Sequence, residues 1–583
     1  MMKILIAAPV RIEIVIAVLV VVAIFLGIAI IQKREWKWMT KVRLELEWGQ
    51  VPTQEYSEKK REALRWYYET HAQGRTQIDD ITWNDLDMDA IFFLLNHTES
   101  SIGEEYLYAL LRMPETDFEK LTERNTLIHY FREHPEERMQ MQLALSGLGK
   151  LQDVSIYEYL NRTEEITDTS NLKHILCALA VPVSLAACIL APLEGIMLLV
   201  AVVFYNIFSY FKKKGEIGNY IQVLGYLLKI LDFAKDSQKI SAEELQSYTE
   251  TIGQVNKNLA AFKRGAFFLV SGSGLGGNVA DVVMDYVRML THVDLIKFNS
   301  MIRQIRTKKE SFDTMFAQIG LLDSTIAVAS FRQCMEESGI CEPELSVWSG
   351  GSYVFHMENI YHPLVQDPVK NSIHATNGVL ITGSNASGKS TFLKTVAINA
   401  ILAQTVYTVL ADSYQGNYFA VYSSMALRDN IMGQESYYIV EIKSLKRIMD
   451  AINPELPILC FVDEVLRGTN TLERIASSSM ILKWVVQQNA VCFAATHDIE
   501  LTHILEEMYT NYHFTESIVE GDVRFDYLLH EGRAISRNAI KLLEVIGYSK
   551  EVTRQAKAMA DSFLKDGVWR KALEKEGNTL EGV

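Results

Sequence analysis

The stretch Thr382-Gly-Ser-Asn-Ala-Ser-Gly-Lys-Ser-Thr391 decides the fold of the C-terminal half of this chain. From Gly383 to Ser390 it matches the phosphate-binding pattern G-x-x-x-x-G-K-[ST] in full. A short apolar run at 379–382 precedes the pattern, and apolar residues at helical spacing follow it over 391–402. Strand, glycine loop and helix is the context that such a nucleotide-binding loop requires.

Each part of this loop has an expected task. The two glycines let successive backbone N–H groups point at phosphate oxygens, and the following helix adds its partial positive charge. Lys389 supplies a full charge to the β- and γ-phosphates, and the Ser390 hydroxyl is offered to Mg²⁺. The predicted nucleotide-binding residues are Gly383, Ser384, Asn385, Ala386, Ser387, Gly388, Lys389, Ser390 and Thr391.

Two further apolar strands end in polar residues. The run at 458–462 leads into Asp463-Glu464, where Asp463 is expected to hold the metal and Glu464 to orient and deprotonate a water molecule. The run at 490–495 leads through Thr496 to His497, whose imidazole is expected near the γ-phosphate. We therefore predict a catalytic set of Glu464, His497 and Lys389, with Ser390 and Asp463 at the metal.

Composition limits the partners. The 583 residues are 49% hydrophobic, enough for several domains with substantial cores. The net charge of −15 repels phosphate backbones, so any contact with DNA has to come from a local patch. The six cysteines form no CxxC pair, which favours a reducing compartment without a disulfide framework or a zinc site.

Three apolar runs predict a membrane protein. Residues 14–31 carry no charge and are followed at once by Lys33 and Arg34, which favours a spanning helix over a cleaved signal peptide. The runs 175–191 and 196–211, separated by a break at 192–195, predict a helical hairpin flanked by Lys173 and the lysines at 212–214. A buried helix pair in a soluble core is the alternative. Three spans would place the N-terminus outside and the rest, including the nucleotide-binding domain, in the cytoplasm.

The motifs together resemble those of the MutS mismatch-repair family, whose ATPase is built like the ABC-type ATPases. Besides the loop, the matching stretches are Asp463-Glu-Val-Leu-Arg-Gly-Thr469, Ala495-Thr-His-Asp-Ile-Glu-Leu501 and His362-Pro363. The resemblance implies an α/β P-loop NTPase domain of ABC/MutS type joined to a mostly α-helical core and lever region, here with predicted transmembrane helices. It also implies ATP and Mg²⁺ as cofactors and a homodimer as the working form.

The dimer expectation rests on the segment 429–441. It resembles the family segment whose serine reaches the γ-phosphate bound by the opposite subunit, and Ser436 takes the place of that serine. Gly433 is carried over with it. The family's usual glycine-basic-serine-threonine run reads Gln-Glu-Ser-Tyr here, so glycine spacing and local charge differ. The resemblance implies two sites, each completed by both chains.

The resemblance extends more loosely over other parts of the chain. The stretches 82–89, 101–108 and 217–334 are similar to the family's core and lever, and 538–564 is similar to its closing helix-turn-helix, with Gly547 ending one helix and Ser549 capping the next. The predicted organisation is a membrane anchor at 1–32, a helical core at 33–172, a membrane hairpin at 173–214, the remaining core and lever at 215–345, the ATPase domain at 346–535 and a dimerisation segment at 536–583.

Some motifs are interpreted as chance. The mismatch-reading and connector domains of MutS fit no part of this chain, since the core-like region begins near residue 40. The Phe-x-Glu tripeptides at 131–133 and 514–516 match the reading motif but lie in the wrong regions. The glycine-rich stretch 272–277 spells a dinucleotide-binding fingerprint, yet no βαβ pattern surrounds it, which favours a joint between helices.

The leading hypothesis is a membrane-anchored ATPase that couples hydrolysis to opening and closing of helical arms. DNA, in a branched or distorted form, is the client that the resemblance implies, while a protein or membrane client is the alternative. A component of an ABC-type transporter is a second alternative, although no Leu-Ser-Gly-Gly-Gln signature occurs. A scaffold that binds ATP without cleaving it is a third.

Overall fold

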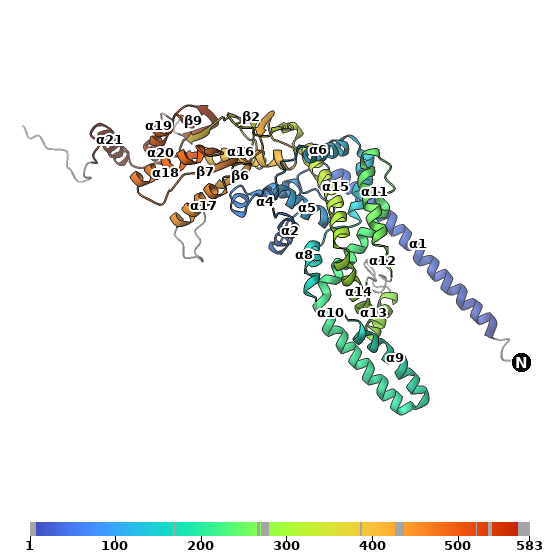
Figure 1. Ribbon diagram of the computed structural model, residues 1–583. Coiled ribbons are helices and arrows are strands. Elements are labelled where there is room, and N and C mark those ends of the chain that lie inside the picture. The colour runs from blue at the N-terminus through green and yellow to red at the C-terminus, as the bar shows by residue number, and fades with distance from the viewer. Residues whose placement is uncertain are drawn as a thin grey trace, which may run out of the picture. The chain divides into compact units, whose positions relative to one another are not determined.

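The computed structural model describes residues 7–166, 170–264, 269, 279–384, 387–425, 437–519, 522–534 and 539–569 (Figure 1). The contacts divide the chain into two units. We call Met1–Thr76 with Phe92–Glu337 the helical unit, and Gln77–Ile91 with Ser338–Val583 the sheet unit. The short segment Gln77–Ile91, which the sequence places inside the helical core, thus belongs to the sheet unit by its contacts.

The described part of the helical unit consists of helices. Its central element is the long helix α15, which packs against α5, α6 and α11 and buries Ile319, Leu322 and Ile326. The stretch Lys309–Ser338 is long and apolar enough to cross a membrane, but 78% of it is buried, so α15 is a core helix. The helices are α1 (Ala7–Glu47), α2 (Glu58–His71), α4 (Met88–Leu95, shared with the sheet unit), α5 (Ser101–Arg112), α6 (Phe118–Glu133), α7 (Pro135–Ser146), α8 (Ile156–Asn161), α9 (Leu172–Leu190), α10 (Pro192–Ser237), α11 (Glu243–Asn258), α12 (Ala260–Lys263), α13 (Val279–Thr291), α14 (Val293–Thr307) and α15 (Lys309–Met335).

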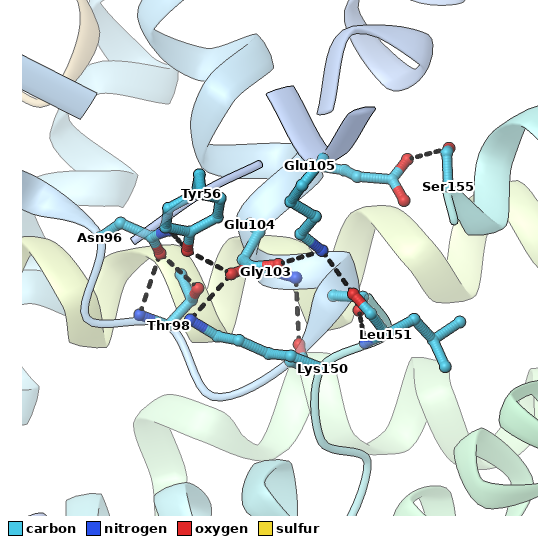
Figure 2. A network of polar contacts seen from close by, with 12 residues as sticks. Tyr56, Asn96, Thr98, Gly103, Glu104, Glu105, Lys150, Leu151 and Ser155 are labelled. Atoms are coloured by element: carbon cyan, nitrogen blue, oxygen red, sulfur yellow. Dashed lines mark hydrogen bonds and ion pairs between the residues drawn. The ribbon is translucent and has the colours of Figure 1, made fainter. Parts of the chain in front are cut away.

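A buried polar network fixes the start of α5 (Figure 2). The Glu104 carboxylate is fully buried, accepts a hydrogen bond of 2.5 Å from the Tyr56 hydroxyl and pairs with Lys60 at 2.8 Å and Lys150 at 2.9 Å. Burial alone would raise the pKa of Glu104, but the two lysines hold it below its ordinary value. A buried charge is tolerated only when it is paired and hydrogen-bonded in this way. The network explains why acidic residues interrupt the apolar pattern of 101–108.

The apolar hairpin is present. Helix α9 ends at Leu190 and α10 begins at Pro192, close to the predicted break, and the two helices pack along each other. Only 17% of the α9 stretch and 22% of Pro192–Gly215 are buried, and by length and composition both stretches suffice to cross a membrane. Helix α10 continues past the predicted end at 211 as far as Ser237, because no residue between them breaks the helix.

Polar contacts join the hairpin to the rest of the helical unit. The Asn206 amide of α10 donates to the Cys177 carbonyl of α9 at 3.0 Å and to the Leu290 carbonyl of α13 at 2.7 Å. Farther along α10, the Tyr210 hydroxyl donates to the Asp294 carboxylate at 2.8 Å. The exposed part of the hairpin therefore begins beyond this buried anchor.

The first apolar run is part of one continuous helix, α1 from Ala7 to Glu47. The helical prediction for 14–31 is confirmed in this sense. Whether this stretch spans a membrane stays a prediction, because the surroundings of most of its side chains lie outside the described structure.

The sheet unit contains two sheets. One has four strands in the order β1-β5-β2-β3, and the other has six in the order β10-β9-β4-β8-β7-β6. Helices α3 (Asp80–Asp85), α16 (Lys389–Thr405), α17 (Tyr437–Ala451), α18 (Thr471–Val486) and α19 (Ile499–Ile504) accompany them. The strands are β1 (Glu344–Ser346), β2 (Phe355–Ile360), β3 (Asn371–His374), β4 (Gly378–Thr382), β5 (Ser413–Asn417), β6 (Ala420–Ser424), β7 (Ile458–Asp463), β8 (Ala490–Thr496), β9 (Tyr509–Val519) and β10 (Asp522–Glu531).

The parallel strands of the six-stranded sheet bring the sequence motifs to one edge. Strand β8 lies between β4 and β7, with Thr382 opposite Thr496 and Asp463 opposite Ala495. Every residue of β4 and β8 is buried, as expected for central strands covered on both faces. The loops that leave the carboxyl ends of β4, β7 and β8 therefore emerge side by side, where α/β sheets bind ligands.

The C-terminal helix pair has the predicted caps. Helix α20 (Ala539–Ile546) is followed by Gly547 at φ 98°, and the Ser549 hydroxyl accepts from the Val552 amide at the start of α21 (Lys550–Asp566). The dimerisation role of this segment stays a prediction.

The chance motifs have structural explanations where they are described. Phe131 is fully buried in α6, and Phe514 is 3% exposed in β9. Neither side chain is available to wedge into a duplex, in agreement with their interpretation as chance. The glycine-rich stretch 272–277 lies outside the described residues.

Candidate nucleotide-binding site

The loop after β4 needs its glycines. Gly383 has φ 150° and Gly388 has φ 106°, in the region that favours glycine. A Cβ at Gly383 would lie 2.8 Å from the Ser387 hydroxyl, and one at Gly388 would lie 3.3 Å from the Tyr527 ring. Helix α16 begins directly after Gly388, which has no side chain to cap its first N–H groups. Those donors are the ones that a phosphate accepts from at a helix N-terminus.

The Lys389 ammonium group lies inside the loop. It donates to the carbonyls of Gly383 at 2.9 Å and Ser384 at 2.8 Å, and the residue is only 5% exposed. Burial lowers the pKa of Lys389, while the carboxylates of Asp463 and Glu464 act in the opposite direction. The predicted contact of this side chain with a phosphate stays a prediction.

Ser390 and Asp463 meet as predicted for a metal site. The Ser390 hydroxyl donates to Asp463 Oδ2 at 2.5 Å. The other oxygen, Oδ1, is buried and accepts no hydrogen bond from any described residue. A hydroxyl beside a carboxylate with an unsatisfied oxygen fits the oxygen ligands that Mg²⁺ prefers. These two residues are therefore suited to hold the ion that the predicted chemistry needs.

Glu464 and His497 are also brought together. Glu464 Oε1 lies 2.7 Å from His497 Nε2, and Oε2 lies 2.7 Å from Arg467 Nε. Burial alone would raise the pKa of Glu464, but the hydrogen bond and charge of His497, with Arg467 and Lys389, hold it below its ordinary value of 4.5. The carboxylate is thus ionised at neutral pH and able to accept a proton from a water molecule.

The backbone at Glu464 is strained. Glu464 has φ 57° and Leu466 has φ 60°, left-handed values that are uncommon for residues other than glycine. The Glu464 amide donates to the Ala495 carbonyl at 2.9 Å, which holds this turn against the end of β8. Such conformations gather at functional sites, where the surrounding structure maintains them.

Glu441 supports the same turn and was not assigned a role from sequence. It is 3% exposed on α17, and its carboxylate accepts hydrogen bonds from the amides of Leu466 and, at 3.3 Å, Arg467. Its place at the end of the 429–441 stretch was visible in the sequence. Its partner was not, because the contact joins a helix to a loop that follows the next strand.

A cavity of about 550 Å³ adjoins the loop. The start of α16 forms part of its wall, the 360–371 segment forms another part, and Tyr527 of β10 is an aromatic side chain on it. Asn371 fixes Tyr527 in place, since its side chain donates to the Tyr527 carbonyl at 3.0 Å and accepts from the Leu529 amide at 2.7 Å. The sequence motifs point to no aromatic residue that would stack on a nucleobase. Tyr527 is a candidate that only the fold reveals.

Four predicted site residues lie outside the described structure. They are Asn385 and Ala386 of the loop, and Gly433 and Ser436 of the segment expected to act on the opposite subunit. Their roles stay predictions. Of the described loop residues, Ser384 donates from its hydroxyl to Glu516 at 2.8 Å, while Ser387 and Thr391 line the cavity.

Comparison with known proteins agrees with these motifs. The family model for MutS domain V matches residues 379–564. DNA mismatch repair protein MutS of Shouchella clausii is 24% identical over 291 residues, 48% of this chain and 32% of that protein. The MutS of Thermus thermophilus is 28% identical over 221 residues, 37% of this chain and 27% of that protein.

A further relative, DNA mismatch repair protein MutS 2 of Haloarcula marismortui, is 31% identical over 192 residues, 32% of this chain and 20% of that protein. The chain thus spans a third or less of the length of these relatives. The match to the family model lies mostly in the mixed α/β part of a helix-rich chain, where the loop, the carboxylates and the histidine lie. Residues 379–564 of this chain thus resemble domain V of MutS proteins, and the similarity to these relatives supports a place in the MutS family.

Proposed function

We propose that this protein is a Mg²⁺-dependent ATPase that works as a dimer on the cytoplasmic face of a membrane. The observation that carries the proposal is the convergence at one sheet edge of Lys389, the Ser390–Asp463 pair and the Glu464–His497 pair. The match of residues 379–564 to MutS domain V supports ATP over other nucleotides, and Tyr527 offers a face for its base.

The residues divide the work of in-line attack by water. Ser390 and Asp463 would hold Mg²⁺, which supplies neutralisation of the charge that develops on the phosphates. Glu464 accepts the proton of the attacking water, and His497 orients the Glu464 carboxylate through their 2.7 Å contact. Lys389 and the first amides of α16 hold the phosphate oxygens in place.

The dimer part of the proposal rests on Ser436 and Gly433. We propose that these residues approach the γ-phosphate bound by the partner chain, so that each site needs both copies. The support is the resemblance of the 429–441 segment and of the C-terminal helix pair, α20 and α21, to the dimerising parts of the family.

The membrane part rests on the apolar surface of α9 and α10. Both stretches are long enough to span, and most of their side chains are exposed. With the run at 14–31 they would make a protein of three spans with the sheet unit in the cytoplasm. The lysines at 212–214 and Lys173 favour this orientation, because basic residues collect on the cytoplasmic side.

DNA is the client that the names of the relatives favour, since they are DNA mismatch repair proteins. We propose that ATP hydrolysis is coupled to DNA binding by the helical arms, without reading of mismatches by this chain. The net charge of −15 favours the second candidate, an ATP-driven clamp on a protein or membrane client. A transporter component is a third candidate, favoured only by the presence of candidate spans.

Phosphate release by the detergent-solubilised full chain tests these proposals. We expect Mg²⁺-dependent release that Glu464→Gln abolishes while labelled ATP is still retained. Adding duplex, branched or single-stranded DNA at fixed salt then separates the clients. Stimulation by one DNA form supports a DNA client, whereas indifference to all of them supports a protein or membrane client. Full activity at concentrations where the chain is a monomer would exclude the composite site.

A further inference from the structure

The segment Gln77–Ile91 is bound to the sheet unit by four side chains, although it lies far from the rest of that unit in sequence. It contains helix α3, the turn at Leu86–Asp87 and the first residues of α4. Since α4 continues past Ile91 into the helical unit, this segment is where the chain leaves the sheet unit on its N-terminal side. Its contacts connect it to the edge of the six-stranded sheet where the nucleotide is proposed to bind.

The most buried of these contacts is made by Asp85. Asp85 is 3% exposed, and its Oδ2 accepts from the Ser423 hydroxyl at 2.7 Å and from the Met425 amide at 2.9 Å. Thr82 adds a third bond, because its hydroxyl accepts from the Ser423 amide at 3.0 Å. A carboxylate is stable at such burial only when its partners are satisfied, so the position of the strand end depends on Asp85.

That strand end lies beside the catalytic carboxylates. Ser423 and Ser424 are the last residues of β6, and Ser424 pairs with Val462 of β7, one residue before Asp463. The neighbouring residue Asp79 strengthens the contact, since both of its oxygens accept from Arg447 at 2.6 Å, and Arg447 also donates to the Ser423 carbonyl. The edge strand β6 is thus fixed from one side by the Gln77–Ile91 segment and from the other by β7.

A second contact leads to the phosphate-binding helix. Asp87, in a left-handed turn at φ 53°, accepts from Lys394 Nζ at 2.6 Å. Lys394 follows Ser390 by one helical turn on α16, so the two side chains share a face of the helix. Ser390 in turn donates to Asp463. Asp87 is therefore connected to the metal-binding pair through one turn of helix.

The Asp87–Lys394 ion pair acts electrostatically on His362, a residue of the cavity wall. His362 Nδ1 accepts from the Leu364 amide at 3.2 Å, so the neutral ring carries its proton on Nε2. Burial and the charge of Lys394 lower the pKa of His362 to about 4, which keeps the ring neutral at physiological pH. Asp87 opposes the Lys394 charge here. The ion pair is thus part of the electrostatic environment of the cavity.

We propose that Asp85 and Asp87 are positioning residues for nucleotide hydrolysis. Asp85 acts through Ser423 on the strand beside Asp463, and Asp87 acts through Lys394 on the helix that carries Ser390. Neither touches the nucleotide. The proposal rests on the ATPase activity proposed above and adds that the Gln77–Ile91 segment sets the geometry of its metal-binding pair.

Charge exchange at the Asp87–Lys394 pair tests this in the full chain. We expect Asp87→Lys to lower kcat about 10-fold and to leave KM within about twofold, because misplacement of a catalytic group acts on the chemical step. The double variant Asp87→Lys with Lys394→Asp restores the pair and should recover most of the lost rate. The matched control is Asp450→Lys, which removes the exposed pair that Lys446 and Asp450 form on α17, and it should leave kcat unchanged.

Asp85 provides a second readout that a merely structural role would not give. Asp85→Asn keeps an acceptor for Ser423 and Met425 and should stay within about threefold of the wild-type kcat, while Asp85→Ala should lose about 10-fold or more. Both should retain labelled ATP. Melting temperatures identify any variant that fails to fold, and the exchanged pair, which is half exposed, then provides the remaining test.

The outcomes are distinguishable. If the wild type releases phosphate and the single variants do so at the same rate, the positioning role alone is overturned. The same conclusion follows if the exchanged pair is as slow as Asp87→Lys. A wild-type protein that releases no phosphate overturns the proposed function and this inference together. Loss of kcat in Asp87→Lys, recovery in the exchanged pair and an unaffected Asp450→Lys establish the inference.

Discussion

The six-stranded sheet and the α9–α10 hairpin use similar apolar residues in opposite surroundings. Every residue of β4 and β8 is buried by other parts of the sheet unit. In the hairpin, large apolar side chains such as Ile189, Leu190 and Phe204 are 84%, 86% and 76% exposed. An apolar surface of this extent is unfavourable in water. The sheet is therefore covered within its own unit, whereas the described residues leave most of the hairpin surface uncovered.

The largest expected effect concerns the sheet edge. Lys389→Ala removes the ammonium group from the loop and should lower kcat/KM for ATP about 100-fold or more, since it removes charge stabilisation of the phosphates. Phosphate release at varied ATP concentration measures this. The variant should still fractionate with membranes, which would show that the two regions act independently. An active Lys389→Ala protein would contradict the assignment of the site.

The hairpin is tested by a charge at its centre. Val183→Arg places a guanidinium on a side chain that is 61% exposed, and insertion of an arginine at the centre of a span costs about 2.5–3.5 kcal/mol. In membranes, we expect a water-soluble labelling reagent to reach more of the hairpin in this variant than in the wild type. Leu472→Arg, on an exposed residue of α18, is the control and should change nothing. Equal behaviour of both variants would favour an aqueous hairpin.

Substitution of Tyr527 tests whether its ring stacks on the nucleobase in the cavity. Tyr527→Ala should weaken ATP binding about 10-fold, because stacking of a base on an aromatic ring contributes about 1–3 kcal/mol. Tyr527→Phe keeps the ring and should bind as the wild type does. Equilibrium binding of labelled ATP distinguishes the two. Equal affinity of all three proteins would place the base elsewhere in the cavity.

The smallest effect is a shift in pH dependence. The pKa of Glu464 lies below its ordinary value of 4.5, so the carboxylate is still ionised at pH 4.5. Activity that depends on this carboxylate is therefore lost only as the pH falls below 4.5. His497→Gln removes the imidazole, which lowers the pKa of Glu464 more than Arg467 does, so the acid limb of kcat should move to higher pH by about one unit. His503→Gln, an exposed histidine of α19, is the control. An unmoved limb would contradict the pairing of Glu464 with His497.

Local patterns predicted the strands and the loop. The runs that became β4, β7 and β8 were recognisable because central strands are continuously apolar and are followed by polar residues with a task. The Ser390–Asp463 pair and the Glu464–His497 pair meet because those strands are parallel and adjacent. The predicted order of motifs and the observed edge of the sheet agree for this reason.

Contacts between distant segments were not predictable from these patterns. The binding of Asp85 to Ser423, the support that Glu441 gives to the turn after β7, and the place of Tyr527 on the cavity each join residues from separate elements. No spacing rule connects them, since each depends on how the chain returns to the sheet. Helix α15 illustrates the same limit in the helical unit, because its apolar composition alone resembles that of a span and only its burial identifies it as core.

Helix α10 has a mechanical consequence. It runs unbroken over 46 residues, about 70 Å at 1.5 Å per residue, from the tip of the hairpin to Ser237. Before the anchor at Asn206 most of its large apolar side chains are exposed, and its second half buries Leu224, Leu227 and Ile230 in the helical unit. The helix is therefore a single rod with one end exposed at the hairpin tip and the other packed in the core of the helical unit. A tilt of the outer end would therefore be transmitted to that core, and the rod would bend most easily at Gly215 and Gly218, which have open space around them.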